Sequence, residues 1–129
     1  MSELLPTARE LEALKILWNQ GRATVRDVYR AMCAEQPELA YTTVLSLMQT
    51  MERKGLVTRE TEGRGKTHYY HAVAKSDPTM RNLAGQFLDT VFDGAVDQYL
   101  VRALEARRPT AEELEELEQM IAKAKKQQQ

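Results

Sequence analysis

The chain has 129 residues, of which 43% are hydrophobic and 29% are charged, a balance typical of one globular domain, with or without an appendage, rather than of a disordered chain. No apolar run approaches the length of about 18 residues that a membrane-spanning helix needs, so we expect no direct insertion into a membrane. Cys33 is the only cysteine, which excludes a disulfide within the chain and favours a cytoplasmic location.

The net charge of −1 conceals an uneven distribution along the chain. Residues 1–75 carry 11 Lys and Arg against 9 Asp and Glu, whereas residues 76–129 carry 7 against 10. The most basic stretch runs from Arg53 to Lys66 and has a net charge of +3. This cluster weakly favours a polyanionic partner, while the near-neutral total argues against non-specific coating of nucleic acid.

The first two predicted helices each begin at a threonine that is followed three residues later by an acidic residue. Thr7 and Glu10 have the spacing of a capping box, and leucines then recur at helical spacing as far as Gly21, which suits a helix end. Thr24 and Asp27 open the second helix in the same way, before an apolar face.

A third helix is predicted from about Tyr41 to Lys54, closed by Gly55. Its apolar stripe consists of Val44, Leu47, Met48 and Met51. Its other face holds hydrogen-bonding side chains, namely Thr42, Thr43, Ser46, Gln49, Thr50 and Arg53. The period then changes, because residues 56–62 and 67–73 are rich in β-forming residues and are separated by Gly63-Arg64-Gly65-Lys66. That pattern predicts a β-hairpin with a basic tip.

Three amphipathic helices are predicted over residues 76–129, because Ser76-Asp77-Pro78 is a start signal and the stretches at Asp93-Gly94 and Pro109-Thr110 interrupt the pattern. A unit of this size is only marginally stable alone, because it can bury too little of its surface. Packing onto the first domain could cover one apolar stripe, and we expect the other stripes to form a homodimer interface. The expected dimerisation residues are Phe87, Val91, Tyr99, Leu100, Leu104, Leu114, Leu117 and Ile121. The predicted domains are therefore 1–75 and 76–129.

Catalytic and metal chemistry find little support in the sequence. His68 and His71 are the only histidines, and on one strand their spacing directs them to opposite faces. Cys33 lies on the apolar face of the second helix, which predicts a buried thiol, and one cysteine with two diverging histidines does not make a four-ligand site. We therefore expect no enzyme activity, no metal site and no cofactor.

Three short helices followed by a hairpin predict a mainly α fold with a small β-hairpin, a winged helix-turn-helix joined to a helical region. In that geometry the third helix enters the major groove of DNA and the hairpin tip reaches neighbouring backbone. The residues expected to contact DNA are Thr42, Thr43, Ser46, Gln49, Arg53, Arg64 and Lys66. A solvated helix face and a plain turn are the simpler interpretations. A winged-helix module that binds protein instead of DNA is the second hypothesis.

The stretch "TVLSLMQTMERKGLV", followed by the hairpin "GRGKTHYYH", resembles the penicillinase repressors, the BlaI/MecI/CopY family of bacterial transcription regulators. The resemblance is close over residues 4–75 and looser over 76–121. It implies a cytoplasmic homodimer that represses transcription from an inverted-repeat operator with TACA/TGTA-like half-sites. It also implies that Thr42, Thr43 and Ser46 lie at the base-reading end of the recognition helix and that Arg64 lies on the wing.

The chain departs from that family in two places. Copper-responsive members carry a C-terminal Cys-x-Cys cluster, which is missing here, so copper sensing through that motif is rejected. β-Lactam-responsive members share an Asn-Phe bond that is cut when a membrane sensor protease is triggered, and the corresponding pair here is Arg102-Ala103. The resemblance implies derepression by a stress or cell-wall/β-lactam-type signal. Cleavage of another bond, another protease and induction without proteolysis stay open.

Overall fold

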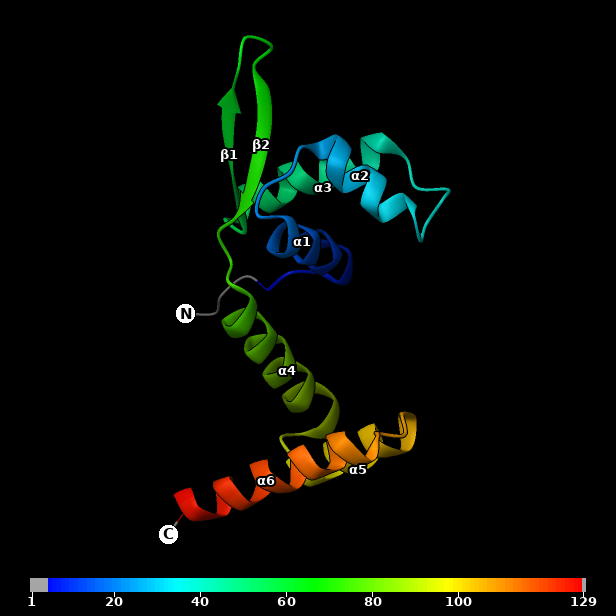
Figure 1. Cartoon of the computed structure of the whole chain (residues 1–129), viewed down its shortest axis with the longest axis vertical. Helices are drawn as coiled ribbons and strands as arrows, with labels where there is room; N and C mark the ends of the chain where they lie inside the picture. The colour runs from blue at the N-terminus through cyan, green and yellow to red at the C-terminus, as the bar shows by residue number, and fades with distance from the viewer. Residues whose placement is uncertain (1–4, 129) are drawn as a thin grey trace. The chain divides into compact units, whose positions relative to one another are not determined.

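The computed structural model describes residues 5–128 and divides into two compact units, one ending at Ala84 and the other beginning at Gly85. Three helices are followed by a hairpin and then by three more helices (Figure 1), which confirms the predicted fold class of mainly α structure with a small β-hairpin. The boundary predicted after residue 75 lies directly before α4 (Ser76–Phe92), whereas the two units meet within that helix. The independence of residues 1–75 stays a prediction.

The first unit, called the head below, is built on three helices whose ends follow from their sequence. They are α1 (Ala8–Gln20), α2 (Val25–Cys33) and α3 (Tyr41–Arg53). The capping boxes of Thr7 with Glu10 and of Thr24 with Asp27 are both present, as predicted. Gly21 ends α1 with a φ of 87°, a left-handed conformation that glycine adopts without steric cost.

The head has a continuous hydrophobic core to which all three helices and the hairpin contribute. Its buried members are Ala13, Leu14, Leu17, Ala23, Val25, Val28, Met32, Leu39, Val44, Met48, Met51, Leu56, Val57 and Tyr70. Cys33 departs from the expectation of a buried thiol. It is only partly buried, because it lies at the end of α2, and its Sγ donates a hydrogen bond of 3.7 Å to the carbonyl oxygen of Leu39.

The hairpin consists of β1 (Val57–Glu62) and β2 (Thr67–Ala72), paired antiparallel from Val57 opposite Ala72 to Glu62 opposite Thr67. Its base is joined to the segment before α2, because the Tyr70 amide donates to the Ala23 carbonyl at 2.8 Å and the Ala23 amide donates back at 3.1 Å. Figure 1 shows the rest of the hairpin projecting beyond the three helices of the head. The core therefore fixes one end of the hairpin and leaves its tip exposed.

The second unit contains the remainder of α4 with α5 (Val96–Ala106) and α6 (Ala111–Gln127). Among the described residues, none after Thr79 is buried. The rings of Phe87, Phe92 and Tyr99 form a cluster whose centroids lie 5.4 to 6.0 Å apart. Within residues 5–128, no helix combines the length and the apolar character that crossing a membrane requires.

Candidate nucleic-acid interface

The exposed face of α3 carries the polar side chains that the sequence analysis selects. Val44, Met48 and Met51 recur at helical spacing and are fully buried, so the opposite side of the helix faces away from the core. The predicted DNA-contacting residues of α3 are all exposed, namely Thr42, Thr43, Ser46, Gln49 and Arg53. The structure thus gathers them on one accessible surface, and their contact with DNA stays a prediction.

The N-terminal end of α3 differs from those of α1, α2 and α6. Each of those three helices begins with a threonine capping box, whereas Ala40 at the start of α3 makes no side-chain cap. The first-turn amides of α3 are therefore left without a capping oxygen, beside Thr42 and Thr43. An uncapped helix N-terminus carries partial positive charge and favours a negative group such as a phosphate.

The hairpin tip presents two cations on a tight turn. Gly63 has a φ of 80° and Lys66 a φ of 51°, and the Lys66 amide donates to the Gly63 carbonyl at 3.1 Å. The sequence suggests glycine for such positions, yet Gly65 is not in the left-handed region and Lys66 is. All four tip residues are exposed, so the side chains of Arg64 and Lys66 are accessible to a partner.

A groove of about 620 Å³ lies between the start of α2, α3 and the hairpin, and two of its basic residues, Arg26 and Arg59, were not among the predicted DNA-contacting residues. Arg26, Arg59 and Lys66 line it together with His68 and Gln49. The Arg26 guanidinium carbon lies 5.6 Å from the centroid of the Tyr41 ring. The sequence signal that could have identified Arg26 is its place in the first turn of α2, the helix that precedes α3. Arg59 carried no such signal.

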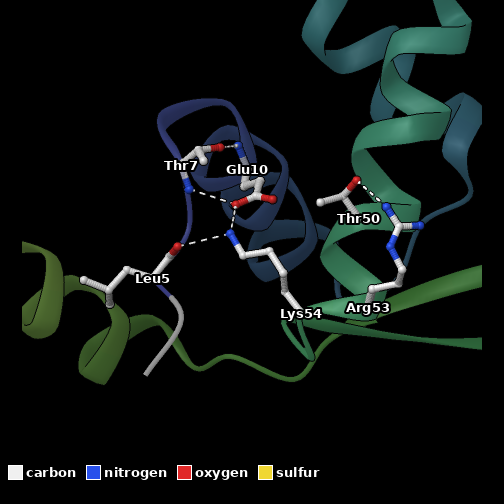
Figure 2. A network of polar contacts seen from close by, with 6 residues as sticks. All are labelled: Leu5, Thr7, Glu10, Thr50, Arg53 and Lys54. Atoms are coloured by element: carbon white, nitrogen blue, oxygen red, sulfur yellow. Dashed lines mark hydrogen bonds and ion pairs between the residues drawn. The ribbon is translucent and has the colours of Figure 1, made fainter. Parts of the chain in front are cut away.

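At the other end of α3, Lys54 joins a partly buried polar network (Figure 2). Its Nζ lies 2.6 Å from Oε1 of Glu10 and donates to the Leu5 carbonyl at 3.2 Å. The Thr7 amide donates to the same Glu10 oxygen at 2.8 Å. Burial alone would raise the pKa of Glu10, but the hydrogen bonds from Lys54 and Thr7 outweigh it, and the pKa lies below its ordinary value. The network fixes the end of α3 against the start of α1.

Some of the basic side chains in residues 53–66 pair with acidic residues, and the others remain accessible. Lys54 pairs with Glu10, and Arg59 lies 3.6 Å from Glu52. Arg53 donates to the Thr50 hydroxyl at 3.0 Å. Among residues 5–128, no ion pair within 4.0 Å engages Arg53, Arg64 or Lys66. Within residues 53–66, the positive charge available to a polyanion is therefore concentrated on the end of α3 and the hairpin tip.

The two histidines make separate contacts on the hairpin. Nδ1 of His68 lies 2.9 Å from the Thr61 hydroxyl, and Nε2 of His71 lies 3.4 Å from the Glu60 carboxylate without hydrogen-bond geometry. In the described part of the chain, no three His, Cys, Asp or Glu side chains gather in a way that could hold a metal ion.

The residues predicted to form a dimer interface lie on α4, α5 and α6. Most are exposed: Phe87, Val91, Leu100, Leu104, Leu114 and Ile121 are each 40 to 53% accessible. Tyr99 and Leu117 are partly buried. Leu100, Leu104, Leu114, Leu117 and Ile121 also line an apolar groove of about 680 Å³ between α5 and α6. Their role in dimerisation stays a prediction.

A core-anchored helix with a polar exposed face, next to a hairpin with a basic tip, defines a winged-helix DNA-binding protein. The family model for the penicillinase repressor matches residues 6–123, so the chain belongs to the penicillinase repressor family. It is therefore a transcriptional repressor. No curated protein sequence matches the chain.

Solved structures that match the chain include proteins from three bacteria, each with a TM-score of 0.45 or less. The S. aureus MepR–DNA complex is 18% identical, with a TM-score of 0.45 over 96% of this chain and 79% of that chain. AdcR, the adhesin competence repressor of Streptococcus pyogenes, is 15% identical, with a TM-score of 0.45 over 99% and 85%. NMB1585, a MarR family regulator of Neisseria meningitidis, is 18% identical, with a TM-score of 0.40 over 96% and 82%. The family assignment rests on the sequence match.

Proposed function

We propose that two copies of this chain bind one inverted-repeat operator in the cytoplasm and block transcription from it. The single observation that supports this most strongly is the exposed polar face of α3, which lies in the same unit as a hairpin tip whose cations form no ion pair with any residue from 5 to 128. The half-sites expected from the family resemblance are TACA/TGTA-like. Each half-site would be read by one copy.

Base reading is assigned to the N-terminal half of α3. Thr42, Thr43 and Ser46 are short hydroxyl side chains, so the helix backbone can approach the base edges closely. Gln49 lies further along the same face and suits adenine, to which it can bond twice. Arg53, Arg64 and Lys66 are assigned to phosphates, because they are exposed cations at the edges of this surface.

Dimerisation is assigned to the second unit. Its helices expose a series of large apolar side chains, and exposed apolar patches of this kind mark interfaces. A two-fold dimer would bring two heads to one DNA molecule, so the second head binds intramolecularly. Half-sites should then lie about one helical turn apart.

Derepression is assigned to loss of the dimer in response to a stress or cell-wall/β-lactam-type signal. A membrane sensor protease is the candidate partner that the family resemblance supplies. The pair Arg102-Ala103 is exposed within α5, and Arg102 lies 3.4 Å from Glu105. Cutting between head and dimer interface would release heads that bind weakly, with no change in the reading helix.

A salt titration separates this proposal from a winged-helix module that binds protein only. Phosphate contacts make the logarithm of affinity fall linearly with the logarithm of salt concentration, with a slope of about −0.9 per contact. We expect a steep slope on operator DNA and tighter binding than to scrambled DNA of the same composition. Equal, weak binding to both DNAs would favour the protein-binding module.

Replacing Thr43 or Ser46 with Ala tests base reading directly. Each change should cost on the order of 1–3 kcal/mol on the operator and less on scrambled DNA. The fold should survive, because both side chains are exposed. Thr90→Ala, which removes an exposed hydroxyl from α4, is the matched control and should change neither affinity. An equal loss of affinity for both DNAs would show that the residue contacts the DNA backbone and does not read bases.

A further inference from the structure

An ion pair joins the head to the last residue pair of the hairpin before its tip. It consists of Arg22 and Glu62 and is called the brace below. Arg22 lies in the turn between α1 and α2, and its Nη1 donates to Oε2 of Glu62 at 2.7 Å. The same guanidinium lies over the Tyr69 ring, with its carbon 4.1 Å from the ring centroid. Glu62 is in β1 and Tyr69 is in β2, so one side chain contacts both strands.

Arg22 contacts the hairpin further from the core than the backbone hydrogen bonds of Ala23 do. The backbone bridge from Ala23 holds Tyr70, which pairs with Arg59, whereas Glu62 pairs with Thr67 in the last rung before the tip. Glu62 is three residues beyond Arg59, which is about 10 Å further from the core at the rise of a β-strand. A two-stranded hairpin is only marginally stable without such support. Through its contact with Glu62, Arg22 thus attaches the hairpin to the head close to the tip.

The backbone of Arg22 is held in place, since its neighbour Ala23 is buried and bonded to Tyr70 in both directions. The hydrogen bond to Glu62 is the largest of the effects that raise the pKa of Arg22 above its ordinary value. Both partners are about half exposed, so the pair adds little to overall stability.

We propose that Arg22 and Glu62 are positioning residues that set the direction in which the hairpin presents Arg64 and Lys66 to the DNA backbone. This inference rests on the proposed function. It has a counterintuitive consequence, because Glu62 is an acidic residue two positions from Arg64. By charge alone, its removal should strengthen binding to a polyanion. As part of the brace, its removal should weaken binding.

The test compares full-length Glu62→Gln with Glu60→Gln. The control removes the same charge from the same strand and alters a 3.4 Å contact with His71, while the hydrogen bond between Arg22 and Glu62 stays in place. Affinity for operator DNA is measured by fluorescence anisotropy, and thermal unfolding checks the fold. Glu62→Gln should weaken binding roughly twofold to fivefold, because an exposed ion pair contributes at most about a factor of five to an equilibrium constant, while Glu60→Gln should leave binding unchanged or strengthen it. Arg22→Lys, which keeps the charge and loses the planar group over Tyr69, should weaken binding as well.

A double-variant cycle with Arg64→Ala shows whether the brace acts through the tip. The effect of Glu62→Gln should largely disappear when Arg64 is already absent. Unchanged or stronger binding by Glu62→Gln would overturn the proposal, and so would an equal loss in the Arg64→Ala background.

Hydrogen exchange of the free protein provides a readout that does not depend on DNA. The Lys66 amide, which bonds to the Gly63 carbonyl, should exchange faster in Glu62→Gln and at the normal rate in Glu60→Gln. Equal exchange in both variants would overturn the brace. If exchange changes as expected but the unaltered protein does not prefer operator DNA, the proposed function is wrong. The inference that Arg22 and Glu62 hold the hairpin tip in position would still stand.

Discussion

The head and the second unit differ in how far they bury their apolar side chains. The head, built on α1 to α3 and the hairpin, buries a core in which Leu14, Val28, Val44, Met48 and Met51 are each 0% accessible. In the second unit, described as far as Gln128, no residue is buried, although Val96 and Met120 are large apolar side chains more than half exposed. The head is closed by its own contacts, whereas the second unit has apolar surface that its own helices leave open.

This difference favours a division of functions, in which the head reads DNA and the second unit mediates association. A closed core can hold α3 and the hairpin rigidly, as a reading surface requires. Open apolar surface suits association. The excess of acidic over basic residues in 76–129 disfavours contact between that part of the chain and DNA. If this division is right, substitutions in the two units should differ in kind, since one set changes the stability of the head and the other changes its association.

The largest effect is expected from Leu100→Asp in the second unit. Leu100 is 40% accessible and lines the apolar groove of α5 and α6. A charge there should leave the chain folded and monomeric, and operator affinity should fall by a factor on the order of 10²–10⁴ as avidity is lost. Sedimentation and a binding titration measure the two effects. Gln98→Asp is the control, and a monomer that keeps full affinity would contradict the division.

The next largest effect is expected from Leu14→Ala in the head. Leu14 is fully buried, so the change should lower the free energy of unfolding by about 2–5 kcal/mol. The loss should not depend on protein concentration, because the core lies within one chain. Thermal unfolding at several concentrations checks this. A loss for Leu14→Ala that disappears at high concentration would show that the head core also depends on association.

A smaller effect is expected from Glu10→Gln, which leaves Lys54 without its anionic partner. The Glu10 side chain is 3% accessible and that of Lys54 is 21% accessible, and we expect a loss of about 1–3 kcal/mol at neutral pH. Because folding lowers the pKa of Glu10 below its ordinary value of 4.5, the stabilisation is fully present above that pH and is lost as the pH falls through the folded pKa.

Unfolding of both proteins across this acidic range provides the measurement. The stability of the unaltered protein should approach that of Glu10→Gln as the pH falls below 4.5. A difference that stays constant over the whole range would show that ionisation of Glu10 contributes nothing. The second unit should offer no counterpart, since its ion pair between Arg102 and Glu105 is exposed on both sides.

The smallest effect is expected from Arg64→Ala at the hairpin tip. The change should weaken binding to all DNA sequences about equally and reduce the salt slope by roughly 1. Arg102→Ala removes a cation from the acidic unit and should leave the slope unchanged. An unchanged slope for Arg64→Ala would mean that the tip is only a turn, and a loss confined to one base position would indicate minor-groove reading.

Much of this fold could be predicted from local sequence. The capping boxes at Thr7, Thr24 and Thr110 are local signals that the tertiary structure does not override. The change of period after Gly55 likewise marks the hairpin. The polar face of α3 could be selected because its apolar stripe has an unambiguous helical spacing.

The rest depends on contacts between residues far apart in the chain. Glu10 and Lys54 are 44 residues apart, and Arg22 and Glu62 are 40 apart, so no local pattern pairs them. Arg26 and Arg59 lie in one groove only because α2, α3 and the hairpin pack together. The basic cluster also looks stronger in the sequence than it is, because Lys54 and Arg59 are paired with acids.

Selection of bound sites from random DNA by the intact chain tests the central claim most directly. The division into a reading head and an associating unit predicts enrichment of an inverted repeat, with two half-sites about one helical turn apart on one face of the duplex. A single half-site without its inverted copy would contradict the dimeric arrangement. No enrichment above random sequence would contradict specific reading by α3.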